Sequence, residues 1–142
     1  MEKTLLIILA IFLIITCIIA GQLINKKNEE QDLKIYNQNF EKYLNKEIQG
    51  TDLASLINEA VNENEKNNVQ KTKNGSYIDN GENSIKIDIN MITIKDTFEM
   101  EAFHSSKIQE FVKNFNTVKF KCTDILYHSN GKVAKLIFEE LP

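Results

Sequence analysis

The sequence predicts an α+β fold: a long N-terminal helix, a second helix, and an antiparallel sheet of about five strands with one short inserted helix. Three observations predict it. An uncharged apolar run fills residues 5–24, apolar side chains then recur every three or four residues as far as residue 66, and from residue 85 they alternate with polar ones. These patterns are typical of a membrane-spanning helix, of amphipathic helices and of half-buried strands, respectively.

The apolar run is Leu5–Ile24, and none of its residues is charged. At helical rise it spans roughly 30 Å, the hydrocarbon thickness of a bilayer. We interpret residues 1–24 as an uncleaved transmembrane anchor, because the run continues to a basic stop at residues 26–27. Two alternatives stay open: a signal peptide cleaved after Ala20, and a lipoprotein modified at Cys17.

The remaining residues, 25–142, are enough for one domain with one core. Two lysines closely follow the span and one precedes it, which taken alone favours a cytoplasmic domain. Against this, the α-amino group adds positive charge to the short leading end, as in signal anchors that insert with that end inside. We therefore expect a single-pass protein of the cell membrane with an extracytoplasmic domain.

Small side chains lie four residues apart within the span, as Thr16 with Ala20 and Cys17 with Gly21. Such spacing makes a notch where a second helix can approach closely, although chance explains it equally well. Cys17, Ala20 and Gly21 are therefore candidates for helix association. The expected partners are the lipid bilayer and other membrane or surface-assembly proteins, including a second copy of this chain.

An aromatic stripe follows the span. Its members recur at helical spacing and predict a helix over about residues 25–47, without Pro or Gly to interrupt it. The stripe includes Tyr36, Phe40 and Tyr43. These three rings are either a docking surface for a partner or the part of the helix that packs into the domain core, and core packing is the simpler interpretation.

A second helix is predicted over about residues 52–66, with Gly50 ending the preceding helix and Thr51 as the N-cap. Alternation at residues 85–91 then predicts a strand. The pair Asn80-Gly81 is a strong hairpin signal, and it predicts a partner strand over residues 76–79. A third strand is expected over residues 97–103.

Apolar residues at helical spacing predict a short helix over about residues 107–116. Alternation resumes after it, but its phase slips at Thr123-Asp124, which predicts a β-bulge. A turn at residues 129–131 leads to the last strand. Asn-Gly pairs precede turns at Gly75, Gly81 and Gly131.

Charge composition argues against nucleic-acid binding. The chain has 17 basic residues, all Lys, against 20 acidic ones, a net charge of −3. The charges are interspersed and form no basic stripe of the kind that nucleic-acid binding needs. We therefore expect no nucleic-acid partner.

Candidates for chemistry are few. Cys122 and His128 are the only thiol and imidazole close in sequence, but Cys122 shares a predicted strand face with apolar residues, so core packing is favoured over catalysis. A metal site would draw on ligand types without a recognised spacing. These residues are His104, His128, Asp79, Glu82 and Asp124. We expect no catalytic, metal or cofactor site, and a non-enzymatic protein.

The layout resembles type IV pilins and the pseudopilins of secretion and competence machines. An apolar half-helix, an amphipathic half-helix and an antiparallel sheet carry this resemblance, whereas the Gly of the prepilin cleavage motif is absent from Met1–Leu5. The segments Phe40–Leu44 and Gly50–Leu53 are also similar to small uncharacterised single-pass membrane proteins of low-GC Gram-positive bacteria. The resemblance implies an assembly subunit of a surface filament, secretion or competence apparatus. The alternative is a membrane-tethered ligand- or peptide-binding module.

Overall fold

The computed structural model of the chain describes residues 2–103 and 106–142. It divides into two compact units, Met1–Ile35 and Tyr36–Pro142. The first unit consists of most of helix α1 (Glu2–Glu41), and the last turns of that helix belong to the second unit. We refer to the second unit as the domain.

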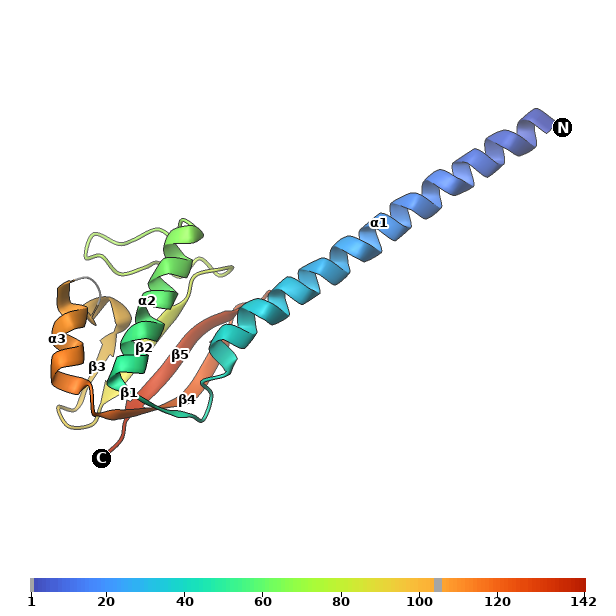
Figure 1. Cartoon of the computed structure of the whole chain (residues 1–142). Coiled ribbons are helices and arrows are strands. Elements are labelled where there is room, and N and C mark those ends of the chain that lie inside the picture. The colour runs from blue at the N-terminus through green and yellow to red at the C-terminus, as the bar shows by residue number, and fades with distance from the viewer. Residues whose placement is uncertain (1, 104–105) are drawn as a thin grey trace. The chain divides into compact units, whose positions relative to one another are not determined.

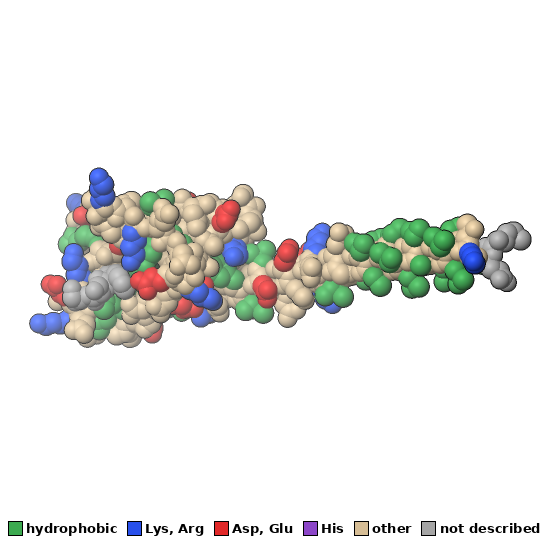
Figure 2. Space-filling view, turned by 90° about the horizontal axis from the view of Figure 1, so that it is seen from above, with side chains coloured by type: hydrophobic (Ala, Val, Ile, Leu, Met, Phe, Trp, Pro, Cys, Tyr) green, Lys and Arg blue, Asp and Glu red, His purple; other side chains and the backbone are tan. Residues whose placement is uncertain are grey.

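The apolar side chains of residues 5–24 are exposed along α1 (Figure 2). Among the residues that the structure describes, α1 is the one helix long and apolar enough to cross a membrane. A signal sequence near the N-terminus passes the same test. The structure therefore supports an apolar N-terminal helix of the kind that either interpretation requires.

The domain is α+β, as predicted (Figure 1). Its five strands form one mixed sheet in the order β1-β4-β5-β2-β3. The strands are β1 (Glu47–Gln49), β2 (Lys86–Met91), β3 (Asp96–Glu99), β4 (Lys119–Tyr127) and β5 (Val133–Glu140). The helices are α2 (Gly50–Lys66), the 3-10 turn η1 (Met100–Phe103) and α3 (Ser106–Phe115).

One face of the sheet carries the core. Alternate strand residues, among them Ile87, Leu136 and Phe138, are fully buried together with the apolar side of α2. The intervening residues form a mainly polar face, where Lys135 Nζ lies 2.7 Å from Asp88 Oδ2. Two apolar residues, Leu126 and Ile137, also lie on this face, opposite Lys135 and Asp88. Alternation along the strands thus separates a buried apolar layer from a more polar one, as the period of two dictates.

The sheet is not wholly antiparallel as predicted, because β2 and β5 are parallel. The strand expected over residues 76–79 is also absent from the sheet, and β1 supplies the fifth strand instead. Only an isolated bridge joins Tyr77 to Lys71 there. The side chains of Asp79 and Asn80 bond the following backbone locally, and such bonds compete with a strand ladder.

Helix α1 ends at Glu41 rather than near residue 47. Asn45 adopts a left-handed conformation with φ 61°, and its N–H donates to the Cys122 carbonyl at 2.9 Å. The chain then joins β4 as strand β1. Strand pairing therefore stops the helix before its sequence pattern runs out.

Other local predictions are confirmed. The register of β4 against β5 shifts between Cys122 and Asp124, where the bulge was expected. Gly75, Gly81 and Gly131 all have positive φ, as Asn-Gly turns require. The predicted short helix corresponds to α3 within one residue at each end.

Gly50 has a different role from the predicted helix stop. It is the first residue of α2, so Thr51 lies inside the first turn, and the N-cap is Gln49 without a side-chain hydrogen bond. A Cβ on Gly50 would lie 2.0 Å from the Phe115 carbonyl oxygen. Gly is needed here because two backbone segments meet.

We expect Gly50→Ala to lower the free energy of unfolding of the domain by about 1–3 kcal/mol, as overpacking typically does. The contact is with backbone, so α2 and the end of α3 must separate. The measurement is the urea midpoint of the domain in detergent. Gly21→Ala is the control, because a Cβ there meets nothing within 4 Å and should leave the midpoint unchanged.

Candidate functional site

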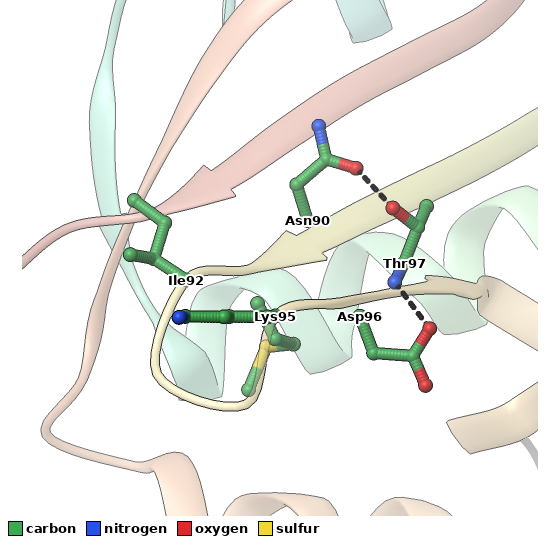
Figure 3. Close-up of a pocket in the computed structure, with 6 residues that line it drawn as sticks. Asn90, Ile92, Lys95, Asp96 and Thr97 are labelled. Atoms are coloured by element: carbon green, nitrogen blue, oxygen red, sulfur yellow. Dashed lines mark hydrogen bonds between the residues drawn. The ribbon is translucent and has the colours of Figure 1, made fainter.

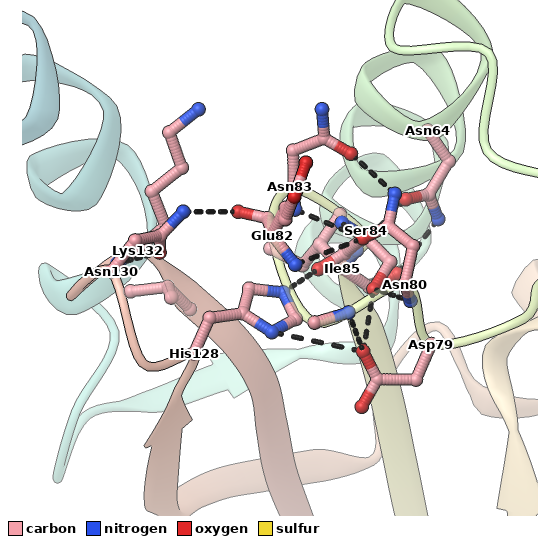
Figure 4. Close-up of polar contacts among 12 residues, drawn as sticks. Asn64, Asp79, Asn80, Glu82, Asn83, Ser84, Ile85, His128, Asn130 and Lys132 are labelled. Carbon is pink, nitrogen blue, oxygen red and sulfur yellow. Dashed lines mark hydrogen bonds and ion pairs between the residues drawn. The ribbon is translucent and has the colours of Figure 1, made fainter.

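A cluster of polar side chains lies where the loop before β2 meets the turn between β4 and β5 (Figure 4). We call it the Asp79–His128 cluster. Its members are Asp79, Asn80, Ser84, His128 and Asn130.

Asn80 shapes the loop. Its Oδ1 accepts the backbone N–H groups of Glu82, Asn83 and Ser84 at 3.0–3.1 Å. Its Nδ2 donates to Asn83 Oδ1 at 2.6 Å. An asparagine side chain that satisfies successive backbone donors fixes a tight turn without a strand partner.

Asp79 links the loop to the neighbouring turn. Its Oδ1 accepts the Gly81 N–H at 2.9 Å and the Ser84 hydroxyl at 3.0 Å, and lies 3.7 Å from His128 Nδ1. The hydrogen bond from the Gly81 backbone, followed by those of Ser84 and the charge of His128, holds the pKa of the Asp79 carboxyl below its usual value, against the opposing effect of burial. The ionised carboxylate is therefore the form that the cluster favours.

His128 is buried, and its Nε2 lies 2.7 Å from the Ser84 carbonyl oxygen. A carbonyl only accepts, so Nε2 carries the hydrogen and donates it. The Ser84 hydroxyl donates to Asp79 rather than to the imidazole. The three residue types of a Ser-His-Asp site are present, but the imidazole is not placed to take the serine proton, which nucleophilic catalysis requires.

The β4–β5 turn is also held from the side of α1. Asn37 Nδ2 donates to the Gly131 carbonyl at 2.8 Å, and Asn37 Oδ1 accepts the Val133 N–H at 2.9 Å. Asn130 Nδ2 donates to the Glu82 carbonyl at 2.8 Å. The turn thus connects the end of α1, the loop before β2 and two central strands, and the cluster acts as a structural clamp.

The lowered pKa of Asp79 predicts a pH effect on stability. Because the folded-state pKa lies below the ordinary value of 3.8, the carboxylate stabilises the fold fully above that value, and the contribution is lost as pH falls through the folded pKa. We expect Asp79→Asn to unfold at lower urea than the wild type near neutral pH. The difference should be modest, since the side chain is 67% exposed, and should vanish in strong acid.

Cys122 and His128 are not brought together as a reactive pair. Cys122 is fully buried, its Sγ lies 3.6 Å from the Asp124 carbonyl oxygen, and burial raises the pKa of its thiol to about 11. The contacts of the His128 ring are to Ser84 and Asp79 instead. The thiol therefore behaves as a small core hydrophobe.

We expect Cys122 to react slowly with iodoacetamide in the folded protein at neutral pH and rapidly after unfolding, since the thiolate is the reactive form. A Cys17→Ser background leaves Cys122 as the single thiol. Labelling is followed by mass spectrometry. Fast labelling of the folded protein would show that the thiol is activated.

The metal candidates do not converge. Within residues 2–103 and 106–142, no group of three or more His, Cys, Asp or Glu side chains could hold a metal ion. Asp79 lies near His128, whereas His104 lies outside the described residues.

The helix-association candidates Cys17, Ala20 and Gly21 are exposed on α1. The three rings of the aromatic stripe are buried to different extents. Phe40 is 1% exposed, and Tyr36 and Tyr43 are partly buried against the core. Burial and the charge of Glu63 raise the pKa of Tyr36 to about 12.

A second candidate site is a depression of about 330 Å³ at the β2–β3 turn (Figure 3). Its lining includes Asn90, whose Oδ1 accepts the Thr97 hydroxyl at 2.8 Å, and Ile92, which is 55% exposed. Glu140 fixes the turn, because its carboxylate accepts both the N–H and the hydroxyl of Thr93 at 2.8 and 2.7 Å. The turn is thus held in place while it presents apolar surface.

Comparisons with family models, curated proteins and solved structures give no match.

Sequence reasoning missed the roles of Asn37 and Ser84 described above, and that of Asn64, whose side-chain amide bonds both the N–H and the carbonyl of Ile85. The Asn-Gly pairs marked the turns themselves, but the bonds from Asn37 and Asn64 reach segments 94 and 21 residues away, respectively.

Proposed function

We propose that this protein is a single-pass, non-enzymatic structural or assembly subunit that presents its domain on the outer side of the cell membrane. A pilin-like or pseudopilin-like component of a surface filament, secretion or competence apparatus is the version that the sequence resemblance suggests. The lipid bilayer and other membrane or surface-assembly proteins are its partners.

One observation carries the proposal. Helix α1 contains the exposed apolar residues 5–24, and the same helix supplies Phe40 to the domain core and Asn37 to the β4–β5 turn. The end of the helix is part of the folded domain. Such a helix suits a subunit whose domain is presented from a membrane, because the membrane segment and the core are encoded in one element.

The polar groups of the domain support a non-enzymatic role. The Cys122 thiol is buried, and the His128 imidazole holds the Ser84 carbonyl. Both groups that the sequence offered for nucleophilic chemistry therefore have structural partners.

A membrane-tethered binding module is the second candidate, and the β2–β3 turn favours it. Ile92, which lines the depression described above, and Ile94, two residues further along the turn, are each 55% exposed. Neighbouring apolar side chains on a fixed turn are the kind of surface that a peptide or protein ligand covers.

Protease treatment of intact cells, with N-terminal sequencing of the mature protein, tests the anchor and the orientation. We expect an uncleaved N-terminus and a domain that external protease digests. A mature chain that begins at Gly21 would indicate a cleaved signal peptide, and one that begins at a blocked Cys17 would indicate a lipoprotein. A domain protected in intact cells and digested only after lysis would reverse the orientation.

Cross-linking in intact cells tests the assembly role. A photoreactive residue in place of Ile94 should give homo- or hetero-oligomers if the β2–β3 turn contacts a partner, whereas the same residue in place of exposed Asn62 on α2 is the matched control. Lysine-directed cross-linkers test the rest of the surface. A strictly monomeric protein under both treatments would contradict the assembly role.

A further inference from the structure

The domain contains three Asn-Gly pairs, each at a turn whose Gly has positive φ. They are Asn74-Gly75, Asn80-Gly81 and Asn130-Gly131. In such a pair the backbone nitrogen of Gly can attack the side-chain amide of Asn, because the following residue has no side chain to hinder the approach. The three pairs have the same local chemistry, so the folded structure decides which of them reacts.

Solvent exposure does not distinguish the three pairs, since all three Asn residues are exposed. The hydrogen bonds of the Asn side chains do distinguish them. Asn80 is fixed by four side-chain hydrogen bonds, three to its Oδ1 from backbone N–H groups and one from its Nδ2 to Asn83. Asn130 is fixed at both ends, with Nδ2 on the Glu82 carbonyl and Oδ1 on the Lys132 N–H at 3.0 Å.

Asn74 differs. Among the described residues, its side chain has no hydrogen-bond partner, and the turn around it is closed by other groups. The Gly75 N–H donates to the Thr72 carbonyl at 3.0 Å, and the Ser76 N–H donates to the Thr72 hydroxyl at 3.2 Å. The Asn74 amide is therefore free to rotate toward the Gly75 nitrogen. The Gly75 N–H must leave the Thr72 carbonyl before the nitrogen can attack. The Gly81 and Gly131 N–H groups, which donate to Asp79 Oδ1 and to the His128 carbonyl at 2.9 Å, carry the same kind of cost, so the side-chain bonds of Asn are what distinguish the three pairs.

We propose that Asn74 is a site of spontaneous deamidation in the folded protein, and that the clamp around Asn80 and Asn130 protects the other two pairs. The Gly75 nitrogen loses its proton to solvent base and bonds to Cγ of Asn74. The Asn74 amide nitrogen takes up a proton and leaves as ammonia, which gives a cyclic imide. Water then opens the ring at either carbonyl and leaves an aspartyl or isoaspartyl residue at position 74, with one additional negative charge.

Asn80 and Asn130 are protected from deamidation by the free energy needed to break their side-chain hydrogen bonds. To react, Asn80 or Asn130 must first break its side-chain hydrogen bonds in a local opening, whereas Asn74 has none to break. In the folded protein we expect position 74 to deamidate at least about tenfold faster than position 80 or 130. When the chain is unfolded, the same three pairs lose this difference.

The test is peptide mapping by mass spectrometry on the full chain in detergent micelles, incubated at mildly alkaline pH with and without urea. Cleavage after Lys73 and Lys86 leaves Asn74 and Asn80 in one peptide, so fragment ions must assign the site. Asn74→Gln supplies the matched control, since the longer side chain disfavours the five-membered ring. In the folded protein we expect the mass to increase at position 74 by the difference between OH and NH2. In urea we expect the same increase at all three positions, at similar rates.

Three results would overturn the proposal. The first is deamidation of Asn80 or Asn130 as fast as Asn74 in the folded protein. The second is a preference for Asn74 that persists unchanged in urea, because local sequence rather than structure would then set the rates. The third is an unchanged mass gain in the folded peptide of Asn74→Gln, which would assign the reaction to another amide.

Discussion

Replacing Phe40 with alanine is expected to lower the free energy of unfolding of the domain by about 3–5 kcal/mol. The Phe40 ring is 1% exposed, belongs to the main core cluster and lies 5.4 Å from the Tyr36 ring, centroid to centroid. Its removal combines the lost burial of a large ring with a cavity that the neighbours fill only in part. Since a domain of this size is stable by about 5–15 kcal/mol, the loss is a large fraction of the total.

Ile35→Ala is the matched control, because Ile35 lies on the same helix and is 52% exposed. The four tyrosines of the chain all lie in the domain and the chain has no Trp, so tyrosine emission during urea unfolding in detergent reports on the domain alone. Equal midpoints for the two variants would mean that Phe40 is a docking residue rather than a core residue.

Asn64→Ala is expected to cost about 2–5 kcal/mol, since it leaves two buried backbone groups without partners. Asn64 is fully buried on α2. Its Nδ2 donates to the Ile85 carbonyl at 2.7 Å, and its Oδ1 accepts the Ile85 N–H at 2.8 Å. One side chain thus satisfies both polar groups of the residue that precedes β2, as a neighbouring strand would.

Asn62→Ala makes the same chemical change at an exposed position of α2, and we expect its free energy of unfolding to change by less than about 0.5 kcal/mol. Asn64→Asp is a second test, because its carboxylate retains an acceptor for the Ile85 N–H but faces the Ile85 carbonyl with no hydrogen to donate. It should be at least as destabilising as Asn64→Ala. Urea midpoints compare the three variants, and an Asn64→Ala midpoint equal to that of Asn62→Ala would refute the role of the paired bonds.

The helices could be predicted from the sequence because their signals are local. Spacing of three and four placed α2 and α3 close to their observed bounds, and the stripe that contains Phe40 marked the side of α1 that enters the core. The end of α1 could not be predicted in the same way. It depends on Asn45 and on the pairing of β1 with β4, which is a contact between distant parts of the chain.

The strands were predicted less completely for a related reason. Alternation identifies which residues face the core, but it carries no information on which strand lies beside which. The parallel pairing of β2 with β5, with β3, α3 and β4 between them in sequence, leaves no local trace. Likewise, the hairpin signal at Asn80-Gly81 correctly indicated a turn, but a clamp with the β4–β5 turn took the place of a strand partner.

The Asp79–His128 cluster lay beyond prediction because its members come from segments far apart in sequence. Composition showed two histidines and many acids, and no spacing linked His128 to Asp79 or to the Ser84 carbonyl. The folded structure places the His128 imidazole so that it donates to the Ser84 carbonyl. The cluster therefore stabilises the two turns and does not form a catalytic site.

The position of β5 has a consequence for biosynthesis. In the order β1-β4-β5-β2-β3, the strand of this sheet that is synthesised last lies in the middle of the sheet. Until it arrives, the β1–β4 pair and the β2–β3 hairpin have no shared edge, and Phe138 is missing from the core. The domain therefore cannot complete its sheet until β5 has been synthesised, and until then the open edges of both strand pairs are exposed to mispairing and aggregation.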